Sequence, residues 1–155
     1  MYIDNLIKEA TLEKNSAKKE AYRAIKAALL LNNSSKNPKS DGKMINVNIG
    51  TDTITLSELE ISIIKKEIQI REEQVSMYEA NSRKDLADMY REQMKYLKEL
   101  LPPEISKDKI QEAVMTAYPN GYTQKEMGKV IKQIKDIYPT ADGKLISEVV
   151  KEHIN

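Results

Sequence analysis

The sequence predicts an all-α protein in two parts, an N-terminal helical hairpin or bundle followed by a small three-helix domain. Two observations predict this class. Apolar residues recur three and four positions apart along most of the chain, which is the spacing of a buried helix face. Pro102 and Pro103 interrupt that spacing, because proline ends a helix and restricts the residue before it. We therefore expect an N-terminal domain at residues 1–101 and a C-terminal domain at 102–155.

Four helices are expected in the N-terminal domain. Two short amphipathic helices fit residues 2–13 and 16–31. A long helix should begin at the capping box of Ser57 and Glu60 and continue to about residue 80. A short connection leads to a fourth helix at 83–101, which predicts an antiparallel hairpin. The inner face of that helix should carry Leu86, Met89, Tyr90, Met94 and Leu97.

Residues 33–55 interrupt the helical pattern. The stretch "NNSSKNPKSDG" has the composition of a loop. Ile45, Val47 and Ile49 then alternate with polar residues, a turn follows at Gly50-Thr51-Asp52, and the alternation resumes at Ile54. This pattern predicts a short β-hairpin within 44–56. A long, partly ordered loop is the alternative.

Three short helices are expected after Pro103, with Ser106, Thr123 and Asp142 as their N-caps. The second of them, in "TQKEMGKVIKQI", has Gly128 in its second turn, where glycine costs about 1 kcal/mol relative to alanine. Two explanations fit: a neighbouring helix approaches Gly128 closely, or the bare backbone admits a phosphate group. The second explanation is suggested by a lysine stripe beside Gly128, with a further lysine near the start of the last helix: Lys125, Lys129, Lys132, Lys135 and Lys144.

Composition excludes several classes of site. There are 25 basic and 24 acidic residues, so no overall field attracts nucleic acid or membrane, and any such site must be local. The absence of cysteine excludes disulfides, thiolate metal sites and cysteine nucleophiles. The lone histidine, His153, lies two residues from the end, and neither a glycine-rich phosphate loop nor a metal-ligand spacing is present. We expect no cofactor, no metal and no catalysis by the chain alone.

The N-terminal stretch lacks the features of a signal peptide, since an acid stands at Asp4 and no apolar core follows a basic region. No apolar run reaches the roughly 18 residues that a membrane span requires. We expect a soluble, cytoplasmic protein with no membrane partner.

Arg71 is the most unusual residue of the N-terminal domain. It lies at the centre of the apolar stripe formed by its helix, where a guanidinium must be paired or must serve a ligand. Folding the helical hairpin brings Arg71 opposite Gln93, which also faces inward. The sequence thus predicts a buried polar pair, Arg71 and Gln93, that fixes the register of the hairpin. A ligand site is the alternative.

The order of several segments resembles the GatB/YqeY family, specifically its stand-alone YqeY-like proteins. The resemblance spans nearly the whole chain except 33–55. It rests on "YRAIKAALL" (22–30), "KKEIQIREEQVSMYEANSRKDL" (65–86), "ELLPPEIS" (99–106), "KEMGKVIKQI" (125–134) and "TADGKLISEVVKEHI" (140–154). It implies an N-terminal helical domain joined to a small domain that is similar to the tail of GatB. GatB is the tRNA-binding subunit of glutamine-dependent aminoacyl-tRNA amidotransferases.

The positions that match the family pattern are Arg71, Arg83, Asp85, Leu101, Pro102, Met127, Gly128, Lys129, Ala141, Asp142 and Gly143. The chain departs from the pattern in three places. The family usually has an acidic residue where Gln93 stands, and a basic one where Thr140 stands. The 33–55 segment is also longer than usual.

The family carries the label of carbon–nitrogen ligase with glutamine as amido-N-donor. That activity belongs to the amidotransferase holoenzyme, whose catalytic parts are absent from this chain. We therefore expect a non-catalytic module that binds tRNA or assists an aminoacyl-tRNA enzyme. The hypothesised RNA-binding residues are Lys125, Gly128, Lys129, Lys132, Lys135 and Lys144. The alternatives are an interaction subunit of a larger protein assembly with no RNA ligand, and an amidotransferase that hydrolyses glutamine by itself.

Overall fold

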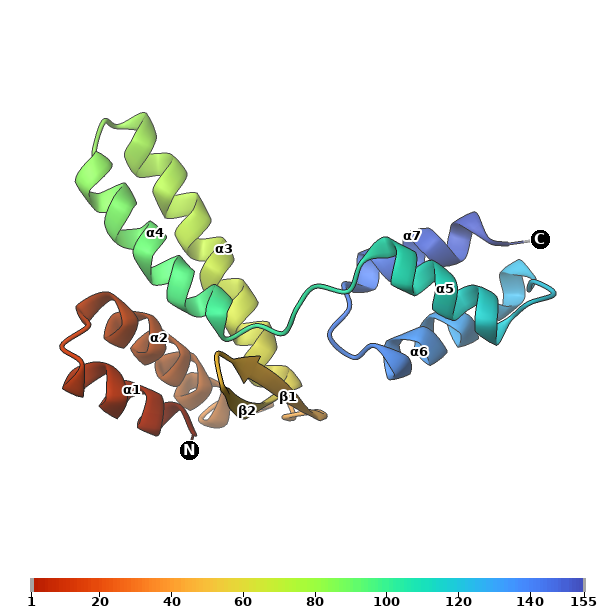
Figure 1. Ribbon diagram of the computed structural model, residues 1–155, viewed down its shortest axis with the longest axis horizontal. Helices are drawn as coiled ribbons and strands as arrows, with labels where there is room; N and C mark the ends of the chain where they lie inside the picture. The colour runs from red at the N-terminus through yellow and green to blue at the C-terminus, as the bar shows by residue number, and fades with distance from the viewer. Residues whose placement is uncertain (1, 155) are drawn as a thin grey trace. The chain divides into compact units, whose positions relative to one another are not determined.

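The structure, a computed structural model, describes residues 2–154. Over that range it is mostly helical, with seven α-helices, one 3₁₀ turn and one two-stranded antiparallel sheet. The chain divides into two compact units, one ending at Pro102 and the other beginning at Pro103 (Figure 1). The predicted fold class, helical with a short β-hairpin, is confirmed.

The N-terminal unit consists of two antiparallel helix pairs and the hairpin (Figure 1). The first pair packs on the second through contacts of its second helix with both helices of the other pair. Buried apolar residues from every element form a single core. The elements are α1 (Tyr2–Leu12), α2 (Ser16–Asn33), β1 (Met44–Ile49), β2 (Asp52–Ser57), α3 (Glu58–Ala80) and α4 (Lys84–Glu99).

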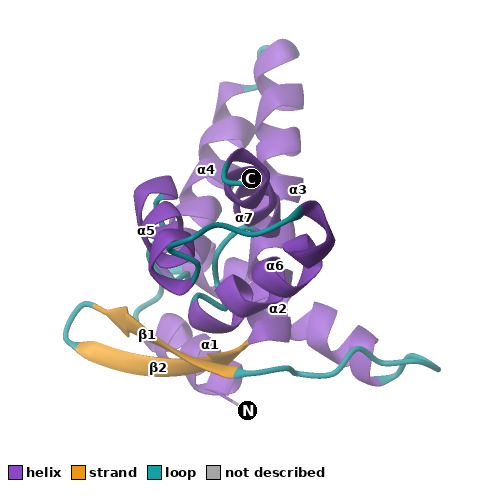
Figure 2. Cartoon of the chain, turned by 90° about the vertical axis from the view of Figure 1, so that its right-hand side faces the viewer, coloured by secondary structure: helices purple, strands orange, loops and turns teal. Residues whose placement is uncertain are grey.

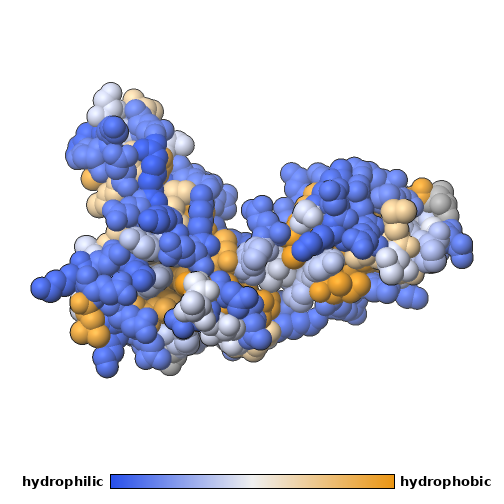
Figure 3. Space-filling model, viewed as in Figure 1, coloured by the Kyte–Doolittle hydropathy of each residue, from blue (hydrophilic) through white to orange (hydrophobic). Residues whose placement is uncertain are grey.

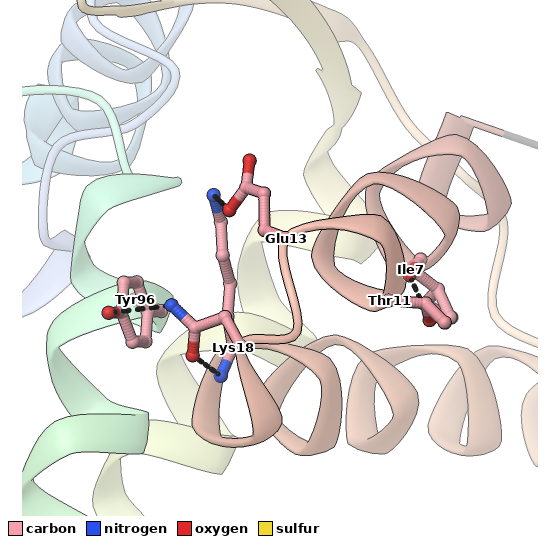
Figure 4. Close-up of polar contacts among 6 residues, drawn as sticks. Ile7, Thr11, Glu13, Lys18 and Tyr96 are labelled. Carbon is pink, nitrogen blue, oxygen red and sulfur yellow. Dashed lines mark hydrogen bonds and ion pairs between the residues drawn. The ribbon is translucent and has the colours of Figure 1, made fainter.

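The turn between α1 and α2 is attached to α4 by Asn15, which bonds to Tyr96. Figure 4 shows Tyr96 on α4 and Lys18 on α2. The Asn15 side chain accepts a hydrogen bond from the Lys18 N–H at 3.0 Å and so caps α2. Its Nδ2 donates to the phenol oxygen of Tyr96 at 2.9 Å. The Lys18 Nζ also pairs with Glu13 at 3.2 Å across the same turn. One asparagine thus fixes both the start of α2 and its place on α4.

The predicted β-hairpin is present, and the alternative of a partly ordered loop is wrong for residues 44–57 (Figure 2). Ile45 lies opposite Leu56, and Val47 lies opposite Ile54, so the apolar residues share one face. Val47, Ile54 and Leu56 are buried in the core. The two-residue turn begins at Gly50, whose φ of +61° is the left-handed conformation that such turns require.

The chain before β1 closes the start of α3. The carbonyls of Lys43 and Asp41 accept hydrogen bonds from the N–H groups of Glu58 and Leu59, each at 3.0 Å. These amides belong to the first turn of a helix, where no intrahelical partner exists. Gly42 has φ +74°, and a Cβ at this position would lie 3.0 Å from the Cβ of Glu58. Residues 41–43, in the middle of the 33–55 insertion, are therefore fastened to the start of α3.

The C-terminal unit is a small bundle with its own core. Tyr122 is buried in it, and its hydroxyl donates to the backbone carbonyl of Val150 at 2.6 Å. Polar residues cover most of the visible surface of each unit, and smaller apolar areas lie among these polar residues (Figure 3). The elements of this unit are α5 (Lys107–Ala117), η1 (Gln124–Glu126), α6 (Met127–Ile137) and α7 (Gly143–Glu152).

One residue expected on an inner face lies outside. Met89 of α4 is 41% exposed, whereas Met94 and Leu97 are buried. Met89 stands one residue before the half-buried Tyr90, which places it about 100° around the helix from that residue. The apolar face of α4 is narrower than the residue types suggest.

Candidate nucleic-acid interface

The start of α6 positions the predicted RNA-binding residues. The Glu126 carboxylate accepts from the N–H of Thr123 at 3.3 Å and from its hydroxyl at 3.1 Å. The Glu126 N–H donates to the Thr123 carbonyl at 3.0 Å, an i→i+3 bond. Such a bond produces a 3₁₀ turn, so the expected helix begins with η1 and becomes an α-helix at Met127. Lys125 therefore lies in η1, while Lys129 lies in α6.

Lys125, Lys129 and Lys132 are exposed on the side of η1 and α6 that points away from the core. Together with Gly128 they are called the lysine face here. The opposite side of α6 carries Val130 and Ile134, which are fully buried. None of the three lysines forms a salt bridge with any residue between 2 and 154. Their charges are not neutralised within the described part of the chain.

Gly128 is exposed, and a Cβ added to it would meet no atom within 4 Å. The explanation that a neighbouring helix approaches Gly128 closely is therefore wrong for the described residues. The physical reason is its position on α6, which is well away from the buried side defined by Val130 and Ile134. The glycine leaves an open backbone surface between the lysines.

Two of the hypothesised RNA-binding lysines have a different setting. The Nζ of Lys135 donates to the backbone carbonyl of Ala141 at 2.7 Å and so ties the end of α6 to the connection before α7. Lys144 lies in the first turn of α7, where Asp142 accepts a hydrogen bond from its N–H at 3.0 Å. The structure groups Lys125, Lys129 and Lys132 but gives Lys135 a structural contact.

The positive charge of this surface is local. Residues 103–155 contain eight lysines and eight acidic residues, so the unit as a whole is neutral. Residues 124–137 contain four lysines but only two acids, Glu126 and Asp136. The excess of charge coincides with the lysine face.

Arg71 and Gln93 are in contact in the N-terminal unit, and each is 7% exposed. The Arg71 Nε donates to the Gln93 Oε1 at 3.0 Å, and its Nη1 donates to the Glu67 Oε2 at 2.7 Å. The same Nη1 also donates to the Glu67 carbonyl at 3.1 Å. The guanidinium is bonded within the helical hairpin, which fits the structural interpretation rather than a ligand site.

Glu67 is the polar partner that reasoning from the sequence missed. It lies four residues before Arg71 on α3, a spacing at which side chains of a helix meet. That spacing is the signal that could have identified it. Glu67 supplies the carboxylate that Gln93 lacks.

A groove of about 740 Å³ lies along α3 and α4, with Val75 and Met94 among its lining residues. Lysines and an arginine line it together with Glu72 and Glu99. Because charges of both signs surround it, the groove does not select anions. The lysine face is therefore the better candidate for binding a polyanion.

Other kinds of site have little support between residues 2 and 154. Over that range, no three His, Asp or Glu side chains are grouped so that they could hold a metal ion. None of the helices described is both long and apolar enough to cross a membrane. The Nε2 of His153 is buried without a hydrogen-bond partner, although the residue itself is partly exposed.

The model of the "Yqey-like protein" family matches residues 2–154. The chain belongs to the YqeY-like protein family. Among curated proteins, none matches it closely enough to count as a relative.

The YqeY-like match includes the 33–55 segment, which the sequence resemblance did not cover. It also includes the lysine face and the group of Arg71, Glu67 and Gln93, which is called the Arg71 cluster here. The YqeY-like assignment establishes the family of the chain.

Proposed function

We propose that this YqeY-like chain is a non-catalytic module that binds tRNA through the lysine face of its C-terminal unit. The observation that supports this proposal is the group of three exposed lysines around Gly128, none of which is in a salt bridge within residues 2–154. Lysines of this kind bind phosphates and release the counterions of the nucleic acid.

The spacing of the lysines suits a phosphate backbone. Lys125, Lys129 and Lys132 lie on successive turns, and seven residues of helix span about 10 Å. A row of this length reaches two or three phosphates of one strand. Contacts with phosphates position a protein but do not read sequence, so we expect little sequence preference from this surface.

The choice of tRNA among nucleic acids rests on the likeness to the tail of GatB. The exposed backbone at Gly128 supports contact with a phosphate of any nucleic acid, because a phosphate can approach a residue that has no side chain. The resemblance implies a basic residue at position 140, where this chain has Thr140, and this removes one cation from the expected phosphate-binding patch.

The test is a comparison of two double variants that change the charge by the same amount. Lys129→Glu with Lys132→Glu reverses the lysine face, whereas Lys109→Glu with Lys151→Glu reverses exposed lysines of α5 and α7. Binding of tRNA is measured by fluorescence anisotropy at several salt concentrations. The first variant should weaken binding and reduce the slope of log affinity against log salt by roughly 1.5, since about 0.7 to 0.9 is lost per phosphate.

The control variant should bind close to the parent. Equal weakening by both variants would mean that net charge alone attracts the RNA. Binding unchanged by the first variant, or absent from the parent, would contradict the proposal.

A second candidate function is an interaction subunit of a protein assembly. It is favoured by three exposed apolar side chains of the α3–α4 hairpin, Ile70, Met77 and Met89, of which the first two lie seven residues apart on α3. This candidate requires that a protein rather than tRNA co-purifies with the chain.

A further inference from the structure

Among residues 2–154, no strand pairs with the outer edge of β1. Within residues 2–154, β1 pairs with β2 and the sheet contains no other strand. An unpaired edge offers N–H and C=O groups that another strand can bind. Proteins usually protect such an edge with charged residues, proline or a bulge, but the strand "MINVNI" has none of these. The edge of β1 is open to strand addition.

The register of the hairpin determines which backbone groups lie on this edge. The Glu58 N–H donates to the Lys43 carbonyl at 3.0 Å, so residue 43 directs its backbone toward β2. Because direction alternates along an antiparallel strand, residues 45, 47 and 49 also bond to β2. Met44, Asn46 and Asn48 therefore direct their backbone groups outward.

We propose that β1 pairs with β1 of a second copy of this chain, antiparallel and about a two-fold axis at Val47. The result is a four-stranded sheet in which Asn46 lies opposite Asn48 of the second copy. Ile45 then lies opposite Ile49 of the second copy, on the apolar face. Both isoleucines are only half-buried in one copy, so pairing would cover them further.

The charges at the ends of the strand agree with this register. Lys43 falls opposite Thr51 of the second copy and next to Asp52, which is exposed. The two-fold axis makes this contact between opposite charges twice, and no like charges face each other.

Other registers fit less well. A shift by one residue would turn the apolar residues of one copy to the polar face. Centring the axis on Asn46 would put Lys43 opposite Ile49 and away from Asp52. Centring it on Asn48 would pair fewer residues of β1.

The test uses two variants of the full chain at the outward positions. Asn46→Lys with Asn48→Lys places like charges opposite each other across the axis, whereas Asn46→Lys with Asn48→Glu places opposite charges there. Analytical ultracentrifugation over a concentration series gives the dissociation constant of the dimer. We expect the parent to dimerise, the first variant to raise that constant by roughly tenfold, and the second to restore it.

Three outcomes would overturn the proposal. The parent could stay monomeric up to its solubility limit, which would leave the edge free or assign it to another protein. Both variants could dimerise like the parent, which would assign the interface to another surface. The second variant could be as weak as the first, which would exclude the register centred on Val47.

A second measurement does not depend on these variants. The chain has no cysteine, so Thr53→Cys on β2 can carry a single spin label. Thr53 lies on the strand away from the proposed contact. Pairing of the two β1 strands would place the labels about 15 to 20 Å apart, because neighbouring strands are separated by about 4.8 Å. No distance in that range would contradict the proposal.

Discussion

The hydroxyl of Tyr122 donates a hydrogen bond to the backbone carbonyl of Val150 at 2.6 Å, which joins the segment before η1 to α7. Tyr122 is buried, and burial raises the pKa of its phenol. The two residues are 28 positions apart, so this bond is a tertiary constraint of the C-terminal unit.

We expect Tyr122→Phe to destabilise the C-terminal unit by about 1 kcal/mol, since it removes one hydrogen bond from a buried carbonyl. It should also change the response to alkali. A phenol whose pKa is raised on folding contributes stability in full below its unfolded value of about 10, and that contribution is lost as pH rises through the folded pKa. Denaturant unfolding between about pH 8 and 11 should show a smaller alkaline loss in the variant. An identical loss in parent and variant would contradict this.

Arg71→Ala should lower the free energy of unfolding by about 2 to 4 kcal/mol, because it leaves Gln93 unpaired in the core and removes buried packing. Arg91→Ala is the matched control on the same hairpin. Arg91 pairs with Glu79 and Asp88 at the surface, where ion pairs contribute about 0 to 1 kcal/mol. Thermal unfolding measures both, and equal losses would show that the Arg71 cluster has no special structural role.

The segment of residues 103–155 should fold alone. Its core consists of residues from its own three helices and the connections between them, and fully buried members include Ile110, Val130 and Ile146. A cooperative thermal transition of the isolated segment by circular dichroism would support this expectation. A spectrum of random coil would show that it depends on the N-terminal unit.

Gly128→Ala should raise the stability of the C-terminal unit by about 0.5 to 1 kcal/mol, because the added methyl group meets open space and alanine favours helix. If a phosphate approaches the bare backbone, the same change should weaken tRNA binding. Thr116→Ala, at an exposed position of α5, is a control for helix propensity alone. Denaturant unfolding and tRNA titration separate the two effects. Lower stability of Gly128→Ala would show that a neighbour approaches that residue.

Local patterns predicted most of the elements correctly. The capping box of Ser57 and Glu60 is present, with bonds of 3.1 and 3.2 Å, and Ser106 and Asp142 cap their helices as expected. The alternation from Ile45 onward predicted the hairpin. These features depend on residues close in sequence, which is why they could be read from it.

Features that depend on tertiary packing were harder to predict. The bond from Asn15 to Tyr96 joins residues 81 positions apart. The open space at Gly128 and the exposure of Met89 depend on which residues of other elements pack against these positions. At the candidate site, the sequence identified the lysines, but only the structure separated Lys135, which bonds to a carbonyl, from the others.

The pairing of neighbours in sequence also bears on how fast the chain folds. In the N-terminal unit, α1 packs with α2, β1 with β2, and α3 with α4. Many of the contacts therefore join elements that follow each other directly in the sequence. Contact order is the mean sequence separation of contacting residues, and helical domains in which it is low fold in roughly microseconds to milliseconds. We expect the N-terminal unit to fold in that range, with the three hairpins forming before α2 docks on α4.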